Sequence, residues 1–205
     1  MDKRSLAAAL FRIGALRFGR FTLTSGKSSS YYLDLRIVPS YPEVYASVID
    51  SYRALADTLG PGGFDAVAGV ATAGLAFASP LAMQLGKPMV YVRSDEKSHG
   101  LGRRVEGALR PSWRALVVDD LATTGGSILS AVRALRSQGC EVGDAAVLVD
   151  RLEGGAAKLE AAGVKLWACV TVEEMLESLL EEGEVTKKDY EAALRQMRSG
   201  ELTAD

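Results

Sequence analysis

Two adjacent carboxylates, Asp119 and Asp120, are the residues whose type and spacing most clearly indicate chemistry. They follow an apolar run and precede a glycine turn, in the segment Leu116-Val117-Val118-Asp119-Asp120-Leu121-Ala122-Thr123-Thr124-Gly125-Gly126-Ser127. Backbone N–H groups at a helix start after such a turn bind anions. Two buried carboxylates are costly unless cations or hydrogen-bond donors face them, and ribose hydroxyls or a sugar developing positive charge would serve. We therefore predict a phosphate site next to carboxylates suited to a ribose.

The simplest alternative for this segment is a strand end followed by a helix N-cap and a glycine turn. For an isolated Asp-Asp pair that reading would be preferred. Here the strand, the acidic pair, the Thr-Thr-Gly-Gly-Ser run and the helix stand in register, which favours a ligand site. The segment is not a P-loop, because no Gly-Lys-Ser/Thr follows the glycines. It also lacks the three-glycine spacing of a dinucleotide fingerprint.

Apolar runs that alternate with helical patterns must position this segment. The alternation predicts an α/β fold with a mostly parallel sheet and helices on both faces. In such sheets ligands bind beyond the carboxyl ends of the strands. We expect strands at 65–70, 88–92, 114–118, 145–149 and 165–170, and helices at 42–59, 74–85, 127–138 and 155–162.

The two ends of the chain show different patterns. Near the N-terminus we expect a helix at 3–18, a turn into a strand at 18–23, a polar loop at 25–30 and a second strand at 31–35. Near the C-terminus, Thr171 and Glu174 have the spacing of a capping box, which predicts a helix to about Glu182. A last amphipathic helix is expected at 186–199.

Composition limits the classes of function. The chain has 205 residues, 48% of them hydrophobic, which fits a single domain with a sizeable core. A net charge of −2 argues against a general nucleic-acid binder. The two cysteines, Cys140 and Cys169, lack metal-ligand spacing. Neither a signal peptide nor a spanning segment is recognisable, so we expect a cytoplasmic protein without a membrane partner.

Residues 93–104 concentrate positive charge in a chain that is otherwise mildly acidic. Cations that close over a leaving anion, with water excluded, stabilise its charge. The alternative is a solvated basic loop, and a lone histidine in a loop is more often incidental than catalytic. The basic side chains of this arm are Arg93, Lys97, His99, Arg103 and Arg104.

Two further segments carry candidate ligand groups. Residues 69–74 follow a predicted strand and open a helix, so their N–H groups can meet an anion, although a plain strand-to-helix turn is the alternative. Arg151 stands at a predicted strand end, where its guanidinium forms a rigid fork suited to a carboxylate. The alternative for Arg151 is a surface ion pair with Glu153 or Asp150.

Together these motifs resemble the type I phosphoribosyltransferases, and in particular their orotate-specific members. Residues 116–127 resemble the motif that binds phosphoribosyl pyrophosphate (PRPP). The resemblance covers roughly 18–179 and includes the hood strands at 21–27 and 31–36, the pyrophosphate loop at 69–74, the mobile loop at 91–100 and 105–107, and the segments 148–151 and 154–155 around the orotate-binding arginine.

This resemblance implies a type I phosphoribosyltransferase fold, in which helices flank a central, mostly parallel sheet and a small N-terminal hood covers the base. It implies one domain over residues 1–205, with a hood of about 1–40 plus part of the C-terminal half, a core of about 60–150, and C-terminal helices at 172–199. The implied reaction joins orotate to PRPP and yields orotidine 5′-phosphate and pyrophosphate, a step of pyrimidine biosynthesis.

The resemblance also implies roles for individual residues. Catalytic roles fall to Asp119, Asp120, Lys97 and His99. Orotate would contact Thr123, Arg151 and Lys27. The implied PRPP contacts are Arg93, Lys97, His99, Thr72, Ala73, Asp119, Asp120, Leu121, Ala122, Thr123, Thr124, Gly125, Gly126 and Ser127. Mg²⁺ would be held mainly by PRPP oxygens and water, with no direct protein ligand. The family forms homodimers in which the mobile loop reaches the neighbouring subunit's site.

Three positions depart from the family pattern, because Thr24, Ala73 and Ser94 stand where members often carry lysine. This leaves open the strength of PRPP binding and the catalytic rate. Three rival functions also remain: a phosphoribosyltransferase for another base such as a purine, a regulator that senses PRPP or nucleotide, and a structural interaction protein. We expect too few residues before the hood for a DNA-reading helix-turn-helix, and the intact acidic motif argues against a purely structural role.

Overall fold

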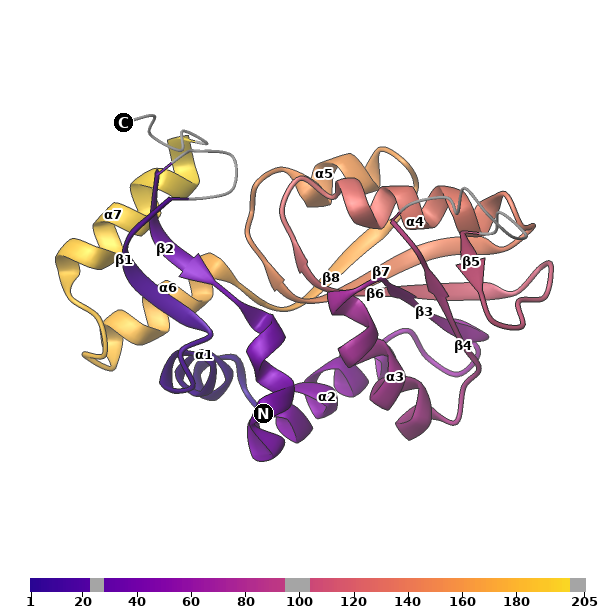
Figure 1. Ribbon diagram of the computed structural model, residues 1–205, viewed down its shortest axis with the longest axis horizontal. Coiled ribbons are helices and arrows are strands. Elements are labelled where there is room, and N and C mark those ends of the chain that lie inside the picture. The colour runs from indigo at the N-terminus through magenta and orange to yellow at the C-terminus, as the bar shows by residue number, and fades with distance from the viewer. Residues whose placement is uncertain (23–27, 95–103, 200–205) are drawn as a thin grey trace.

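The computed structural model describes residues 1–22, 28–94 and 104–199. Its centre is a six-stranded sheet with the order β5-β4-β3-β6-β7-β8 (Figure 1). All pairs are parallel except β4 with β5. The strands are β3 (Ala66–Val70), β4 (Met89–Val92), β5 (Val105–Glu106), β6 (Arg114–Ala122), β7 (Glu141–Asp150) and β8 (Lys165–Thr171). The predicted α/β class and mostly parallel sheet are thus confirmed.

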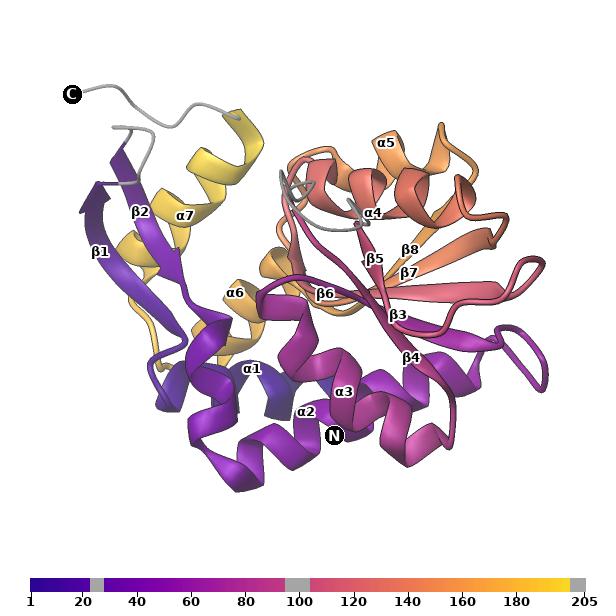
Figure 2. The ribbon, with the colours of Figure 1, turned by 45° about the vertical axis from the view of Figure 1, so that its right-hand side comes forward.

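Helices cover both faces of this sheet (Figure 2). On one side lie α2 (Pro42–Asp57) and α3 (Ala73–Leu85), and on the other α4 (Gly126–Arg136) and α5 (Gly155–Glu160). Each layer buries its own apolar cluster against the sheet. Strands buried on both faces read as continuous apolar runs, which is why their positions could be predicted from the sequence.

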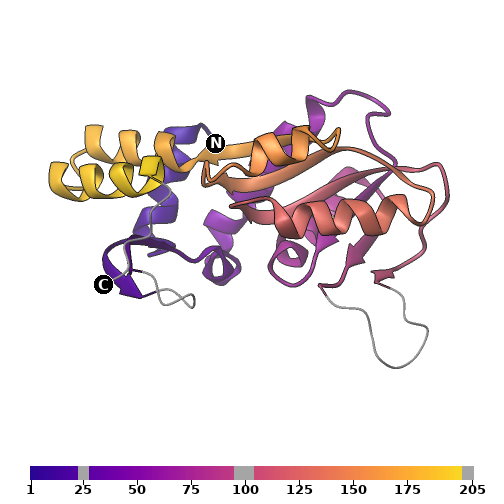
Figure 3. The same cartoon turned by 90° about the horizontal axis from the view of Figure 1, so that it is seen from above.

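A second, two-stranded antiparallel sheet of β1 (Leu16–Thr22) and β2 (Ser28–Leu33) stands beside the main one. Three helices support it: α1 (Lys3–Arg12), α6 (Val172–Glu181) and α7 (Lys187–Ser199). The view from above separates this group, which we call the hood, from the main sheet (Figure 3). A 3-10 helix, η1 (Leu35–Ser40), leads from the hood to α2.

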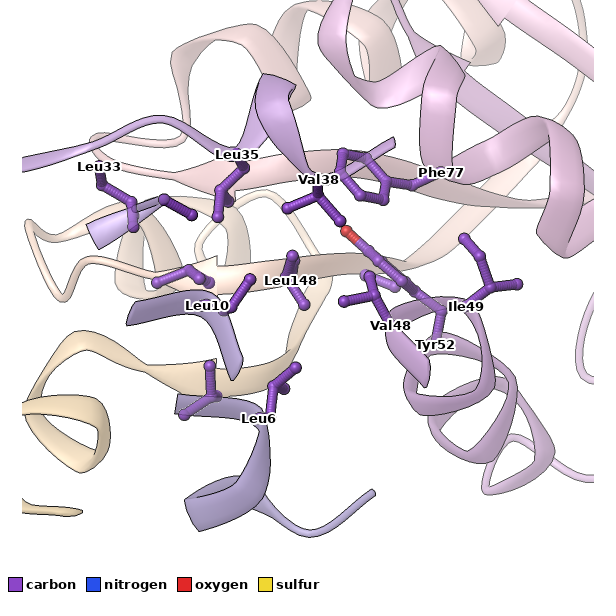
Figure 4. Close-up of a cluster of buried hydrophobic side chains, with 14 of the residues drawn as sticks. Leu6, Leu10, Leu33, Leu35, Val38, Val48, Ile49, Tyr52, Phe77 and Leu148 are labelled. Atoms are coloured by element: carbon purple, nitrogen blue, oxygen red, sulfur yellow. The ribbon is translucent and has the colours of Figure 1, made fainter. Parts of the chain in front are cut away.

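The hood and the main sheet share one hydrophobic core. Figure 4 shows Leu10 of α1 and Leu33 of β2 in the same cluster as Leu148 of β7 and Phe77 of α3. Each of these side chains is at least nine-tenths buried. The cluster runs without a break from the hood to the sheet face that α2 and α3 cover.

Several boundaries differ from the prediction. The first helix ends at Arg12 and not near residue 18, because Gly14 takes a left-handed conformation (φ 76°) that ends the helix and lets β1 begin at Leu16. The predicted polar loop is partly strand, since β2 begins at Ser28. That strand also ends early, because the Asp34 side chain accepts the N–H of Arg36 and caps η1.

Two strands of the candidate site, β6 and β7, are longer than predicted. The sequence placed Asp119 and Asp120 directly after a strand, whereas β6 continues through both residues to Ala122. Parallel pairing with β7 extends it, since the register continues to Ala122 opposite Asp150. Apolar pattern alone ends a strand at its first charged residue, so this extension was not predicted.

At the C-terminal side, the predicted capping box is confirmed. Thr171 and Glu174 exchange side-chain hydrogen bonds with each other's backbone N–H at the start of α6. Among the described residues, no helix is both long and apolar enough to cross a membrane.

Candidate active site

The acidic pair lies at the carboxyl end of β6, between its two neighbouring strands. Asp119 is 7% exposed, and its Oδ1 accepts the backbone N–H of Asp120 at 3.0 Å. From α2, the hydroxyl of Tyr52 donates to the backbone carbonyl of Asp119 at 2.6 Å. Tyr52 is fully buried, so this bond fixes the backbone of β6 from the face of the sheet that α2 covers. Sequence reasoning missed Tyr52, because 67 residues separate the two partners.

Burial changes the acidity of both carboxyls. It raises the pKa of Asp119 to about 8, and the nearby charge of Asp120 adds to the effect. Burial also raises the pKa of Asp120, although hydrogen bonds and Arg36 oppose the shift. A carboxylate whose charged form is disfavoured gains most from ligands that donate hydrogen bonds or carry positive charge. The pair is therefore suited to sugar hydroxyls and to positive charge that develops on a sugar.

The start of α3 approaches this pair closely. A Cβ atom on Gly74 would lie 2.9 Å from Asp119 Oδ1 and 2.7 Å from the Val118 carbonyl oxygen, so glycine is required there. Thr72 is the N-cap of α3 and Ala73 its first residue. The structure thus brings the predicted residues 72 and 73 next to the acidic pair, at the end of a helix that favours anions.

The predicted phosphate loop connects β6 to α4. Gly125 is the N-cap of α4 and takes a left-handed conformation (φ 70°). Residues 119–128 line a cavity of about 190 Å³. The predicted residues among them include Leu121, Ala122, Thr123, Thr124, Gly125, Gly126 and Ser127. A second cavity of about 250 Å³ shares Gly126 and Ser127 with the first and is also lined by Arg93 and Arg104.

Arg93 lies at the end of β4, beside the start of α4. Its guanidinium is 3.9 Å from the Glu106 carboxylate, and Arg104 donates to the Ser130 hydroxyl of α4 at 2.8 Å. Both arginines thus border the second cavity. The predicted residues Lys97, His99 and Lys27, and the departure at Thr24, lie outside the described residues.

Arg151 follows β7 and joins the phosphate loop through its backbone, since its N–H donates to the Ala122 carbonyl at 2.9 Å. The alternative for this residue was an ion pair with Glu153 or Asp150, and the pair with Glu153 is present at 2.7 Å. The guanidinium also lies 5.3 Å from the ring centre of Tyr31, a hood residue. Its side chain is 16% exposed, and its buried Nε has no hydrogen-bond partner within the described part of the chain.

Asp150 and Gly155, near Arg151 in the sequence, make supporting contacts that the sequence did not predict. The buried carboxylate of Asp150 accepts the N–H of Leu152 at 2.9 Å, and Leu152 has a positive φ of 59°. Gly155, the first residue of α5, packs so closely that a Cβ atom there would lie 2.5 Å from the Thr123 carbonyl oxygen. The glycine pair at 154–155 was noticed only for its resemblance, because its contact across the fold leaves no local signal.

The structure therefore gathers most of the predicted site at one edge of the sheet. The carboxyl ends of β3, β4, β6 and β7 bring together Thr72, Ala73, Arg93, the acidic pair, the loop 121–127 and Arg151. An acidic pair between two helix starts that favour anions, at the carboxyl edge of a parallel sheet, defines the phosphoribosyltransferase class.

Comparisons with known proteins agree with this class and narrow it. Residues 40–166 match the phosphoribosyl transferase domain family. The orotate phosphoribosyltransferase of Cenarchaeum symbiosum is 45% identical over 177 residues, 84% of this chain and 87% of the relative. The chain belongs to the orotate phosphoribosyltransferase family.

Solved structures extend the likeness to the fold. The orotate phosphoribosyltransferase of Aeropyrum pernix superposes with a TM-score of 0.77 at 40% identity, covering 88% of this chain and 99% of that one. The UMP synthase of Leishmania donovani superposes with a TM-score of 0.83 at 32% identity. That likeness covers 97% of this chain but 43% of the synthase, so the chain spans less than half of that protein.

Proposed function

We propose that this protein transfers the 5-phosphoribosyl group of PRPP to orotate and releases pyrophosphate, as a step of pyrimidine biosynthesis. The observation that carries the proposal is the buried pair Asp119 and Asp120 between the starts of α3 and α4, with Arg151 bonded by its backbone to the same loop. The similarity to orotate phosphoribosyltransferases over most of the chain supports orotate as the base.

The 5′-phosphate of PRPP occupies the loop from Thr123 to Ser127. Backbone N–H groups at the start of α4 and the three hydroxyls of Thr123, Thr124 and Ser127 donate to it. Asp119 and Asp120 accept hydrogen bonds from the ribose hydroxyls. Their negative charge stabilises the positive charge that develops at C1 as the bond to pyrophosphate breaks.

Orotate is a planar carboxylate and binds on the Arg151 side of the loop, with Thr123 and Lys27 as further contacts. The Arg151 side chain is 16% exposed, and its planar guanidinium is suited to a carboxylate such as that of orotate. Little proton transfer is needed in this reaction. Positioning and charge stabilisation therefore supply most of the acceleration.

The pyrophosphate of PRPP lies between the start of α3, with Thr72 and Ala73, and the basic arm that begins at Arg93. Lys97 and His99 contribute from that arm. The partner subunit of a homodimer supplies the arm to each site. We expect the enzyme in the cytoplasm, and neither nucleic acid nor membrane among its partners.

Mg²⁺ fits this site on the chemistry of its donors. The adjacent carboxyls of Asp119 and Asp120 have pKa values raised by burial, and a nearby divalent cation would relieve that cost. The cation would reach them through PRPP oxygens and water, without a dedicated set of protein ligands. When bound, it neutralises charge on the pyrophosphate.

A direct assay tests the proposal. Purified protein is mixed with Mg²⁺, PRPP and orotate, and the loss of orotate absorbance is followed while each component is omitted in turn. We expect loss only when all are present, and no consumption of the base when adenine, hypoxanthine or uracil replaces orotate. Consumption of a purine in place of orotate would identify a different phosphoribosyltransferase. PRPP binding without turnover of any base would favour a sensor.

Arg151→Ala tests the assignment of the orotate contact. Loss of a charged hydrogen-bonding partner should lower kcat/KM for orotate by about 10–100-fold. The KM for PRPP should change little, because the backbone hydrogen bond from Arg151 to the Ala122 carbonyl is kept in this variant. Arg133→Ala, which removes an exposed arginine at the far end of α4, is the matched control. An equal loss for both substrates would contradict the assignment.

A further inference from the structure

Within the hood, Gln196 of helix α7 forms hydrogen bonds with the strand β2. The amide oxygen of Gln196 accepts the backbone N–H of Ser30 at 2.7 Å and the Ser30 hydroxyl at 2.9 Å. Its amide nitrogen donates to the Ser29 hydroxyl at 2.8 Å. The backbone N–H of Ser30 can only donate, so the orientation of the amide is fixed by its partners. More than 160 residues separate Gln196 from these two serines.

The Ser29 hydroxyl continues this chain of hydrogen bonds toward the active site. Ser29 is 2% exposed, and its hydroxyl donates to the Tyr31 carbonyl at 2.6 Å. The amide nitrogen of Gln196 donates to that hydroxyl, which leaves the hydroxyl proton for the Tyr31 carbonyl. Gln196 thereby fixes the backbone of β2 at Tyr31.

Tyr31 connects β2 to the orotate side of the site. Its side chain is 2% exposed, and its ring lies 5.3 Å from the Arg151 guanidinium. Arg151 is otherwise held by Glu153 at 2.7 Å, while its buried Nε has no partner among the described residues. The aromatic face therefore helps to set the position of the guanidinium, together with the Glu153 carboxylate.

We propose that Gln196 is a positioning residue for orotate, which acts through Ser29 and Tyr31 on Arg151. Helix α7, although distant from the acidic pair, then determines the affinity for orotate and not that for PRPP. The inference rests on the proposed orotate role of Arg151. Turnover of orotate by the wild-type enzyme is the baseline, and its absence would refute the proposed function before any variant is compared.

Gln196→Met removes all three hydrogen bonds while it keeps the length and helix propensity of the side chain. We expect the KM for orotate to rise about 5–10-fold, the scale for loss of a hydrogen-bonded constraint on a charged ligand contact. The KM for PRPP should stay within about twofold of the wild-type value, because the phosphate loop is untouched. Arg195→Gln, which alters the neighbouring exposed residue, should leave both constants unchanged.

Gln196→Glu separates docking of α7 from positioning of Arg151. A carboxylate still accepts both hydrogen bonds from Ser30, so the thermal unfolding midpoint should stay close to that of the wild type. It cannot donate to Ser29, whose hydroxyl proton is then drawn away from the Tyr31 carbonyl. We expect the orotate KM of this variant to rise as in Gln196→Met.

A double-mutant cycle with Tyr31→Leu tests the route. Once the ring beside Arg151 is gone, Gln196→Met should raise the orotate KM by less than twofold further, on the order of experimental error. Fully additive effects would overturn the proposal. So would a wild-type orotate KM in Gln196→Glu, or an equal rise in both KM values for Gln196→Met, which would leave α7 a structural support alone.

Discussion

Asp119 is held from three directions by groups of different kinds. The Tyr52 hydroxyl fixes its carbonyl, the Asp120 N–H fixes its carboxylate, and the missing side chain of Gly74 leaves the space that the carboxylate occupies. The carboxylate of Asp119 is thus held in place before any ligand binds, and its burial raises its pKa. A site arranged in this way has a measurable signature in the ligand-free protein.

The signature is a dependence of stability on pH. The pKa of Asp119 rises from an ordinary value of 3.8 to about 8 in the folded protein. Between these values the folded state keeps a proton that the unfolded chain has lost, so this group's contribution to stability declines as the pH rises from about 4 to 8. Asp119→Asn keeps a neutral side chain of the same shape. Near pH 8.5 we expect the free energy of unfolding of this variant to exceed that of the wild type by about 2 kcal/mol. The thermal unfolding midpoint should then be roughly 4–8 °C higher.

Thermal unfolding of the ligand-free proteins across this pH range checks the prediction. Asp57→Asn, which changes an exposed carboxylate on α2, is the matched control and should follow the wild type. The gap between Asp119→Asn and the wild type should widen as the pH rises. Parallel curves would show that Asp119 titrates in its ordinary range.

At the scale of elements, the phosphate loop is shaped by a helix that carries none of its ligands. Gly155 at the start of α5 lies directly against Thr123 and Gly125, and Arg151 donates its N–H to Ala122. The segment after β7 therefore supports the loop after β6 from the side. Arg151, the proposed orotate contact, and the proposed phosphate loop are thus parts of one packed unit.

Gly155→Ala should disturb this unit. The added methyl would lie 2.5 Å from the Thr123 carbonyl oxygen, which is closer than any real contact, so the loop must shift. We expect a loss of about 1–3 kcal/mol in the free energy of unfolding. The KM for PRPP should rise about tenfold or more, because the loop's N–H groups are displaced from the phosphate. Denaturant unfolding and steady-state kinetics measure the two effects.

Gly143→Ala is the control for this change, because a Cβ atom at Gly143 would meet no heavy atom within 4 Å. It adds the same methyl group near the start of β7, at the end of that strand away from Arg151 and α5. If both alanine variants bind PRPP as the wild type does, the close packing of α5 has no part in shaping the loop.

The sequence was sufficient for the elements that local pattern specifies. The apolar runs of β3, β6 and β7, the α6 capping box and the acidic segment before α4 could all be located from spacing. The contacts that support these elements could not be predicted from the sequence. Tyr52 with Asp119, Gly155 with Thr123 and Gln196 with Ser29 each join segments that only the tertiary fold brings together, and a tyrosine, a glycine and a glutamine carry no local sign of such partners.

At the scale of the whole molecule, the proposed homodimer has two sites that each combine residues of both chains. Asp120→Asn and Lys97→Ala should each be nearly inactive alone. If the arm crosses between subunits, a mixed dimer contains one site with both defects and one with neither. After random reassortment of equal amounts, about one quarter of the wild-type activity should return.

Mixing Asp120→Asn with Asp119→Asn provides the control. Both changes fall on the same chain's part of the site, so no mixed dimer contains an intact site and no activity should return. Recovery in the first mixture and not in the second would support the shared arm. Equal failure of both mixtures would mean that each subunit is complete by itself.

The single core beneath the hood and the main sheet limits how this protein can be altered. Leu10 and Leu33 pack in the same cluster as Phe77 and Leu148, so the described part of the hood, which we propose covers the base, shares its interior with the main sheet. A hood transferred from a relative that recognises another base would carry core side chains that fit a different sheet. Recognition of the base and packing of the interior are thus inherited together, and a graft has to carry both.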